Sequence, residues 1–236
     1  MTLIAGLIII TLLYIVSVNA IKKVPVVFYV GVYLWQAVVI AYYGLELNEQ
    51  FPAWFTTYFM DIFQRGMFST ITFIIVMYLG VITTHNTVTR KLMSIRGELS
   101  IIGCLSVICH NIIFGVLYFP ALVQHPELMT ARNKAASIVT IILLIIMVPL
   151  FITSFKCVRR KMNGKKWKNL QRFAYPFYFL IYVHVMILFT ADIEAHLTGI
   201  VIYTVIFGAY AVLRLRKYFI QKAKKQKKIA AKEAHA

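Results

Sequence analysis

The stretch from Arg96 to Tyr118, RGELSIIGCLSVICHNIIFGVLY, is a long apolar run with a single histidine, His110, near its middle. A second apolar run, from Phe173 to Asp192, also carries a single histidine, His184, near its middle. An ionisable side chain deep inside a membrane helix is costly, and by default it marks a functional site. We therefore expect these two histidines to lie at the centre of the protein's function.

The composition is that of an integral membrane protein. Hydrophobic residues make up 61% of the 236 residues and charged residues only 14%, whereas a soluble domain carries about 25% charged residues. The apolar residues are grouped in seven blocks, most of them long enough to cross a bilayer. Only a helix satisfies its own backbone in lipid, so each block is predicted to be helical. The blocks are Thr2–Ala20, Val24–Leu45, Met67–Thr87, Leu99–Leu122, Ala135–Phe155, Phe173–Ala191 and Gly199–Leu213.

The predicted fold class is therefore all-α, a polytopic transmembrane helical bundle in one compact unit. Residues 1–23 are predicted to form an N-terminal transmembrane helix, residues 24–213 the bundle proper, and residues 214–236 a basic tail. The first block is followed, not preceded, by the basic pair Lys22 and Lys23. We therefore interpret it as a retained anchor and not as a signal peptide.

The basic residues predict the orientation. The net charge of +17 could suggest a nucleic-acid partner, but 22 of the 25 Lys and Arg residues fall in alternate connecting stretches and in the tail. Such residues stay on the cytoplasmic side of a membrane. We therefore predict seven spans, with the N-terminus outside and the C-terminus cytoplasmic, and no nucleic acid as partner. The tail is expected to contact anionic membrane lipid, with docking of an acidic redox partner as the alternative.

The two histidines are predicted to lie at the same depth. Counted from the cytoplasmic ends of their helices at Leu99 and Phe173, each is the twelfth residue, which is about 17 Å into the membrane. Two imidazoles at matched depth on separate helices suit axial ligation of the iron of haem b. Three alternatives stay open. They are histidines that merely join helices, a zinc site that would need further ligands, and a proton relay.

The surroundings of His110 suit a bulky planar ligand. Gly103, Ser106 and His110 are spaced by three and four residues, so on one continuous helix they would share a face. Small residues there would leave room for a porphyrin. Phe114, one turn further along, would form a wall. His125 and His196, near the outer face, are expected to be solvated.

Three groups of residues resemble the ferric reductase-like transmembrane family. They are the run from Asn48 through Ala53-Trp54 to Gly66, the residues Arg96-Gly97-Glu98-Leu99 ahead of His110, and the residues Trp167 to Arg172, WKNLQR, ahead of His184. The chain is most similar to small bacterial members that include the haem-binding membrane subunit of the methionine sulfoxide reductase system. Six predicted helices fit this pattern, and the first is then an extra N-terminal helix.

The resemblance implies a b-type cytochrome in a bacterial cytoplasmic membrane. It implies electron transfer from a cytoplasmic flavin reductase or another flavin- or NAD(P)H-linked donor to an extracytoplasmic acceptor or partner protein. It also implies that His110 and His184 hold the outer haem. Family members often hold an inner haem at positions that correspond here to Arg96 and Gln171. One haem is therefore expected, since a second would need another ligand, such as His85.

The sequence leaves three functions open. The chain contains no glycine-rich dinucleotide fingerprint and no P-loop, so another protein must load electrons onto it. The basic loop with Lys165, Lys166 and Arg172 could bind haem propionates or the phosphate of a flavin at the cytoplasmic face. An electron-transfer cytochrome is favoured. The alternatives are a cofactor-free membrane protein, such as a small transporter or assembly subunit, and a reductase with its own outer-face substrate site.

Overall fold

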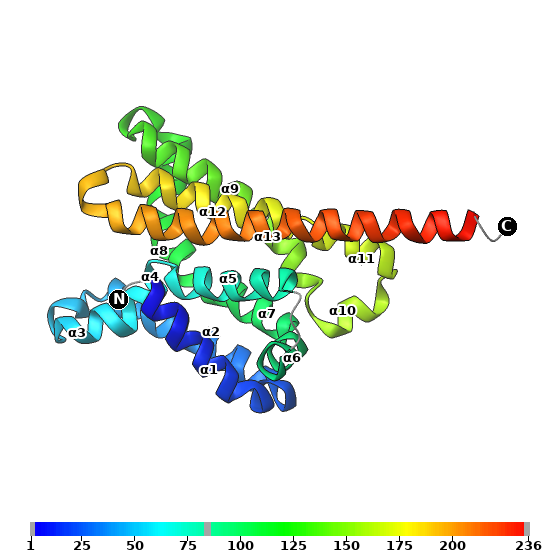
Figure 1. Ribbon diagram of the computed structural model, residues 1–236. Helices are drawn as coiled ribbons and strands as arrows, with labels where there is room; N and C mark the ends of the chain where they lie inside the picture. Colours follow the sequence, from blue (N-terminus) through cyan, green and yellow to red (C-terminus); the bar gives the residue numbers. More distant parts are fainter. Residues whose placement is uncertain (1–2, 83–85, 234–236) are drawn as a thin grey trace.

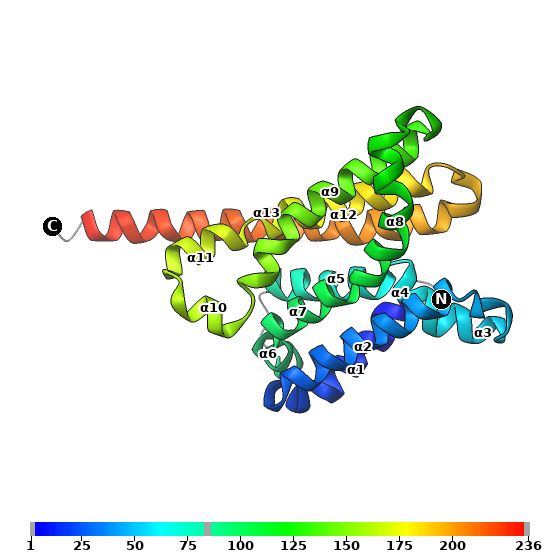
Figure 2. The same cartoon turned by 180° about the vertical axis from the view of Figure 1, so that it is seen from behind.

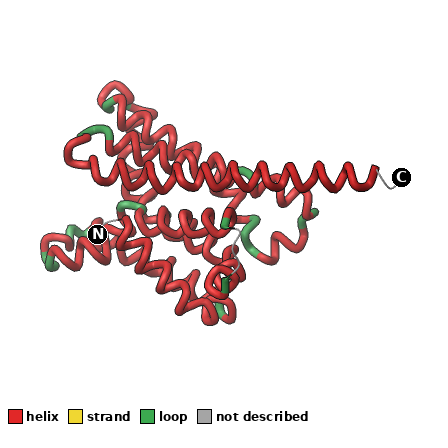
Figure 3. Tube along the Cα trace, viewed as in Figure 1, coloured by secondary structure: helices red, strands yellow, loops and turns green. Residues whose placement is uncertain are grey.

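The computed structural model describes residues 3–82 and 86–233, and all regular structure in these residues is helical (Figure 3). His85, the possible substitute ligand, lies outside the described residues. The elements run α1 Leu3–Lys23, α2 Pro25–Gly44, η1 Leu47–Glu49, α3 Ala53–Phe55, η2 Thr56–Met60, α4 Asp61–Gln64, α5 Met67–Val81, α6 Thr87–Ser94, α7 Arg96–Ser106, α8 Ile108–Gln124, η3 Pro126–Leu128, α9 Ala131–Ile152, α10 Lys156–Lys161, α11 Gly164–Gln171, α12 Ala174–Phe189 and α13 Ile193–Glu233.

The predicted fold class is confirmed, because every predicted apolar block contains a helix of the bundle. Within the described residues, six helical segments are long and apolar enough to cross a membrane. A seventh span results if the α3–α4 segment and α5, which are bent by 57° relative to each other, cross it together. The protein is thus a multi-pass membrane protein. The count of seven and the orientation stay predictions.

Helix α5 lies at the centre of the bundle, packed against α1, α7, α12 and α13 (Figure 1). Its residue Thr72 is fully buried and makes a 2.8 Å hydrogen bond with the hydroxyl of Tyr14 on α1. A hydrogen bond between membrane helices contributes about 0.6 kcal/mol on average. The N-terminal helix is therefore packed into the core and is not a detached anchor.

Helices α7 and α8 form one apolar segment with a break at Val107 (Figure 2). Helix α2 packs along both sides of this break. Helix α8 then leads away from α5 toward the pair of helices α9 and α12, which pack closely together (Figure 2). The space between α5 and α8 on one side and α9 and α12 on the other contains the candidate site.

One end of the bundle carries most of the basic residues, and we call it the basic end. There the ammonium of Lys217 donates a 2.8 Å hydrogen bond to the carbonyl of Gly80, in the last turn of α5, and the guanidinium of Arg96 lies beside the same residue. Cations at a helix C-terminus are favoured by its dipole. The buried carboxylate of Glu98 pairs with Lys156 at 2.6 Å. The first two contacts hold the basic end of the central helix, and the third joins α7 to α10.

Helix α13 is longer than the sequence predicted. The predicted span Gly199–Leu213 is part of a continuous helix of 41 residues, Ile193–Glu233. Its C-terminal part passes α11 and projects beyond the rest of the bundle at the end where α10 and α11 lie (Figure 1). The predicted basic tail is therefore a direct extension of a membrane helix.

Candidate functional site

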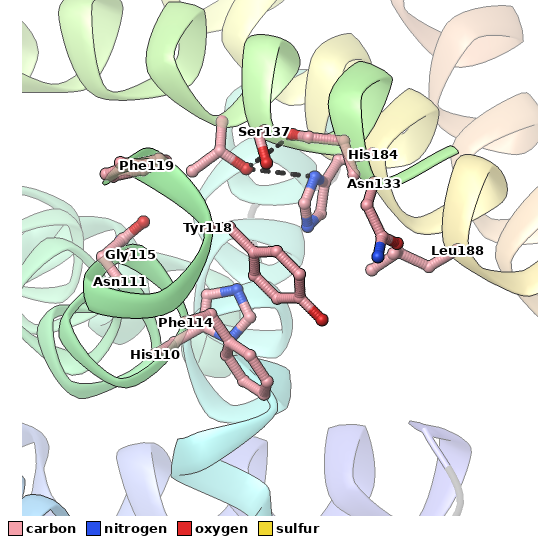
Figure 4. A pocket seen from close by; sticks show the side chains of 12 residues that line it. His110, Asn111, Phe114, Gly115, Tyr118, Phe119, Asn133, Ser137, His184 and Leu188 are labelled. Atoms are coloured by element: carbon pink, nitrogen blue, oxygen red, sulfur yellow. Dashed lines mark hydrogen bonds between the residues drawn. The ribbon is translucent and has the colours of Figure 1, made fainter. Parts of the chain in front are cut away.

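The structure brings His110 of α8 and His184 of α12 together across one cavity (Figure 4). The centres of their rings are 6.3 Å apart, and the ring planes are perpendicular, at 90°. Both histidines are half-buried. Two histidines that are 74 positions apart in the sequence thus form one pair, as their matched depth predicts.

The hydrogen bond of His110 defines its tautomer. Its Nδ1 lies 2.8 Å from the backbone carbonyl oxygen of Gln64, at the end of α4. A carbonyl can only accept, so Nδ1 must carry the proton, and Nε2 keeps a free lone pair. A histidine that donates one ring N–H to a backbone carbonyl is the usual arrangement around a protein-bound metal.

The same reasoning applies to His184. Its Nδ1 lies 3.3 Å from the hydroxyl oxygen of Thr140 on α9, and that hydroxyl donates its own proton to the carbonyl of Ala136 at 2.9 Å. The oxygen of Thr140 therefore accepts from Nδ1 of His184. This leaves Nε2 of His184 unprotonated as well. Nε2 of each histidine is thus unprotonated and can donate a lone pair to a metal ion.

The spacing of the rings suits a metal ion between them. A metal–imidazole bond is about 2 Å long and a ring nitrogen lies about 1.1 Å from the ring centre, so an ion held by two imidazoles separates their centres by about 6 Å. The observed separation is 6.3 Å. No group of three or more His, Cys, Asp or Glu residues that could hold a metal occurs among the described residues. Two donors are too few for a bare zinc ion but suffice for haem iron, which needs only axial ligands from the protein.

The cavity around the pair has two lobes that share both histidines. The larger lobe has a volume of about 390 Å³ and the smaller one about 150 Å³. The larger lobe alone lies in the range of ligand pockets in proteins. Toward the basic end its lining is apolar, with Phe73, Leu143, Met147, Phe177 and Ile181.

Polar groups line the smaller lobe and the opposite end of the larger one. Asn111, Asn133, Ser137 and Tyr118 surround the smaller lobe (Figure 4). Arg65 and His196 line the larger lobe at the end away from the basic end, where the ring of His196 stacks on Phe189 with centres 4.9 Å apart. The polar side chains of the lining thus lie among apolar ones away from the basic end, whereas the lining toward the basic end is apolar, which suits an amphipathic ligand.

Of the three residues predicted to surround the haem beside His110, only Phe114 lines the cavity. Phe114 lines both lobes, with its ring centre 5.1 Å from that of His110. Gly103 and Ser106 do not line the cavity, because the break at Val107 separates their helix, α7, from α8. A Cβ at Gly103 would lie 3.0 Å from the ring of Phe73. The expectation of a shared face is therefore corrected, since Gly103 makes room for Phe73, which itself lines the cavity.

The two weaker candidates lie outside the cavity lining. Arg96 lies beside Gly80 at the basic end. The amide of Gln171 donates a 3.2 Å hydrogen bond to the hydroxyl of Thr153, at the end of α9. Both side chains therefore contribute to the packing of the basic end, about four helical turns from the histidine pair.

Several residues of the site were not predicted from the sequence. Thr140 had a weaker signal, since it is a polar residue in an apolar helix and the thirteenth residue counted from the end of α9 at Ile152, close to the depth of the histidines. The carbonyl of Gln64 had none, because a backbone acceptor leaves no trace in the sequence. His196 was expected to be solvated; its side chain is exposed but also borders the cavity.

One comparison with known proteins identifies a family. The model of the family described as ferric reductase like transmembrane component matches residues 65–182, which include His110 and end two residues before His184. A protein of Treponema pallidum (strain Nichols), itself uncharacterized, is 38% identical over 154 residues, 64% of this chain and 42% of that protein. The chain thus spans less than half the length of this relative. No solved structure matches the chain.

The family match covers half of the chain, and it contains α5, α7, α8 and α9, which surround the cavity. The chain therefore belongs to the family of the ferric reductase like transmembrane component.

Proposed function

We propose that the chain is a b-type cytochrome that passes electrons across a membrane, with His110 and His184 as the axial ligands of one haem. The observation that carries the proposal is the histidine pair, with both Nε2 atoms free and ring centres 6.3 Å apart. Membership of a family of membrane redox components supports it. When bound, the haem supplies a centre that accepts and releases one electron at a time.

The chain's own residues have definite roles in this proposal. The carbonyl of Gln64 and the hydroxyl of Thr140 hold the two histidines in the tautomer that can bind iron. Phe114 borders the bound group next to His110. The apolar lining toward the basic end would exclude water from the nearest edge of the bound group. One haem per chain is expected, because Arg96 and Gln171 offer no axial donor at the basic end.

The classes of donor and acceptor are those that the family resemblance implies, and the predicted orientation assigns them to the two faces of the membrane. Electrons enter at the basic end from a cytoplasmic flavin- or NAD(P)H-linked protein and leave to an extracytoplasmic acceptor or partner. Within the family, we place the chain with the small bacterial members that include the haem-binding subunit of the methionine sulfoxide reductase system. The similarity to a protein of a bacterium, Treponema pallidum, supports a bacterial cytoplasmic membrane as its location.

An absorption spectrum tests the proposal directly. The protein is purified from cells supplied with ample haem, and the dithionite-reduced minus oxidised spectrum is recorded together with the haem content per chain. A sharp low-spin b-type signal at one haem per chain is expected. Purified protein without haem would contradict the proposal. Two haems per chain would contradict the assignment of a single site.

The polar end of the cavity predicts how the haem is oriented. Arg65 and His196 supply donors there for the two carboxylates of haem, whereas the other end is apolar. A hydrogen bond to a charged group contributes about 1.5–3 kcal/mol. Arg65 is 68% exposed and also pairs with Asp61 at 3.1 Å, so the lower value is appropriate. The haem-free protein should therefore bind haem about tenfold more tightly than its dimethyl ester.

The double variant Arg65→Gln, His196→Gln should lose the preference for haem over its dimethyl ester. Titration of the haem-free protein should give similar affinities for the two compounds. The control is Arg132→Gln, which removes an exposed cation on α9 outside the cavity lining. It should keep the tenfold preference. A double variant that still prefers the free acid would mean that the carboxylates bind elsewhere.

A further inference from the structure

The break between α7 and α8 lies directly before His110 and has a visible cause. In a continuous helix the N–H of Cys109 would bond to the carbonyl four residues earlier. Instead it donates to the side-chain oxygen Oε1 of Gln36, on α2, at 3.1 Å. A side chain that inserts into the hydrogen-bond ladder is one of the known causes of a helix kink. The side chain of Gln36 therefore takes up the N–H that would otherwise join α7 and α8 into one continuous helix.

This contact is completely buried. Gln36 is 1% exposed and Cys109 is 0% exposed, among Val39, Tyr42 and Met60. An amide without full hydrogen bonding is costly in such surroundings. The second polar atom of the side chain, Nε2, has no hydrogen-bond partner among the described residues. A leucine of similar size would avoid that cost, so apolar packing alone does not account for a glutamine here.

The contact is adjacent in sequence to an iron ligand of the proposed cytochrome. The backbone of Cys109 leads straight into His110, whose ring is fixed on its other side by the carbonyl of Gln64. The direction of Nε2 of His110 therefore depends on two hydrogen bonds. Gln36 of α2 holds the backbone at Cys109, and the carbonyl of Gln64 of α4 holds the imidazole ring. Helix α2 lies outside residues 65–182, which match the family.

We propose that Gln36 is a positioning residue for His110. By accepting the N–H of Cys109 it sets the angle between α7 and α8, and thereby the direction in which Nε2 of His110 meets the iron. This inference rests on the proposed function. It assigns a role at the haem site to a helix that the family match does not include.

The test compares three variants of the haem-loaded protein. Gln36→Leu removes the acceptor at nearly constant volume. Gln36→Glu keeps a side-chain oxygen in the same place. Tyr42→Phe is the control, because it removes another hydrogen bond of α2, the 2.6 Å contact with Thr56, in the same buried cluster. The readouts are the rate of haem transfer to apomyoglobin and the EPR spectrum of the ferric protein, which depends on the angle between the imidazole planes.

Gln36→Leu should lose haem about tenfold faster, the effect usual for removing an outer partner of a metal ligand. Its EPR spectrum should depart from that of rings at 90°. Gln36→Glu and Tyr42→Phe should retain both the rate, within about twofold, and the spectrum. A Gln36→Leu protein with unchanged haem loss and spectrum would overturn the inference, as would a Tyr42→Phe protein that changes equally.

Hydrogen exchange separates this inference from the proposed function. In haem-free protein, Gln36→Leu should change amide exchange within residues 105–112, and Gln36→Glu and Tyr42→Phe should not. If the wild-type chain takes up no haem, the proposed function fails, and a positioning role at haem fails with it. If it takes up haem but exchange in this segment is the same in all variants, only the role of Gln36 is overturned. Should Gln36→Leu not fold, Gln36→Met gives the same comparison.

Discussion

Replacement of His110 or His184 by alanine should abolish stable haem binding. Each substitution removes one of the two proposed axial donors and leaves the cavity otherwise intact. Loss of an outer partner of a metal ligand costs about 10–100-fold in affinity, so loss of the ligand itself should exceed about 100-fold. Haem content per chain and the reduced-minus-oxidised spectrum measure the effect. The remaining histidine can hold iron only in a five-coordinate state, which loses the sharp low-spin signal.

A matched control separates ligation from a general effect of losing a histidine. His125 lies at the end of α8, 63% exposed, 3.5 Å from Glu127, and outside the cavity lining. His125→Ala should retain one haem and the wild-type spectrum. Added imidazole should restore the low-spin signal in His110→Ala, because the cavity then has room for it beside the iron. Full haem content in both alanine variants would rule out the pair as ligands.

Gly66→Val should have the second large effect. Gly66 adopts φ = 67°, a left-handed conformation, at the bend between α4 and α5. A β-branched residue is a true outlier there, and such strain costs about 1–3 kcal/mol. A Cβ at this position would also lie 3.4 Å from Cγ of His110. The larger side chain should therefore both lower the free energy of unfolding and displace the ring of His110.

Two further variants distinguish the two causes. Gly66→Asn relieves much of the backbone strain, because asparagine tolerates the left-handed region, but it still presses on the ring. It should fold almost as stably as wild type and nevertheless show a changed spectrum and faster haem loss. Gly208→Ala, in open space on α13, should leave the spectrum unchanged and gain up to about 1 kcal/mol of stability. A Gly66→Asn protein with a wild-type spectrum would mean that the ring contact has no influence on His110.

The main features of the fold and the histidine pair could be predicted because they depend on long-range regularities of the sequence. Blocks of apolar residues must become helices in lipid, and each predicted block contains one. The pairing of His110 with His184 followed from equal depth on two helices. That argument requires only the rise per residue and the ends of the apolar runs, both of which the sequence contains.

The contacts that orient the pair could not be predicted in the same way. Gln64 acts through its backbone carbonyl, which every residue possesses. Gln36 acts by inserting into another helix, and the resulting break at Val107 has no glycine or proline to mark it. The expected face of Gly103, Ser106 and His110 assumed an unbroken helix and was wrong for this reason. Thr140 alone leaves a trace in the sequence, as a polar residue within an apolar block.

The shortness of α5 has an electrical consequence. Its 15 residues extend about 22 Å, whereas the apolar layer of a bilayer is about 30 Å thick. Arg96 and Lys217 at one end bring charge to Gly80, and the histidine pair lies at the other end, beside Gly66. In the predicted orientation, an electron that moves from the level of these cations to the proposed haem site, about 17 Å into the membrane, crosses rather more than half of the apolar layer. A cell interior at negative potential then drives the transfer outward, by up to about 2.3 kcal/mol for every 100 mV.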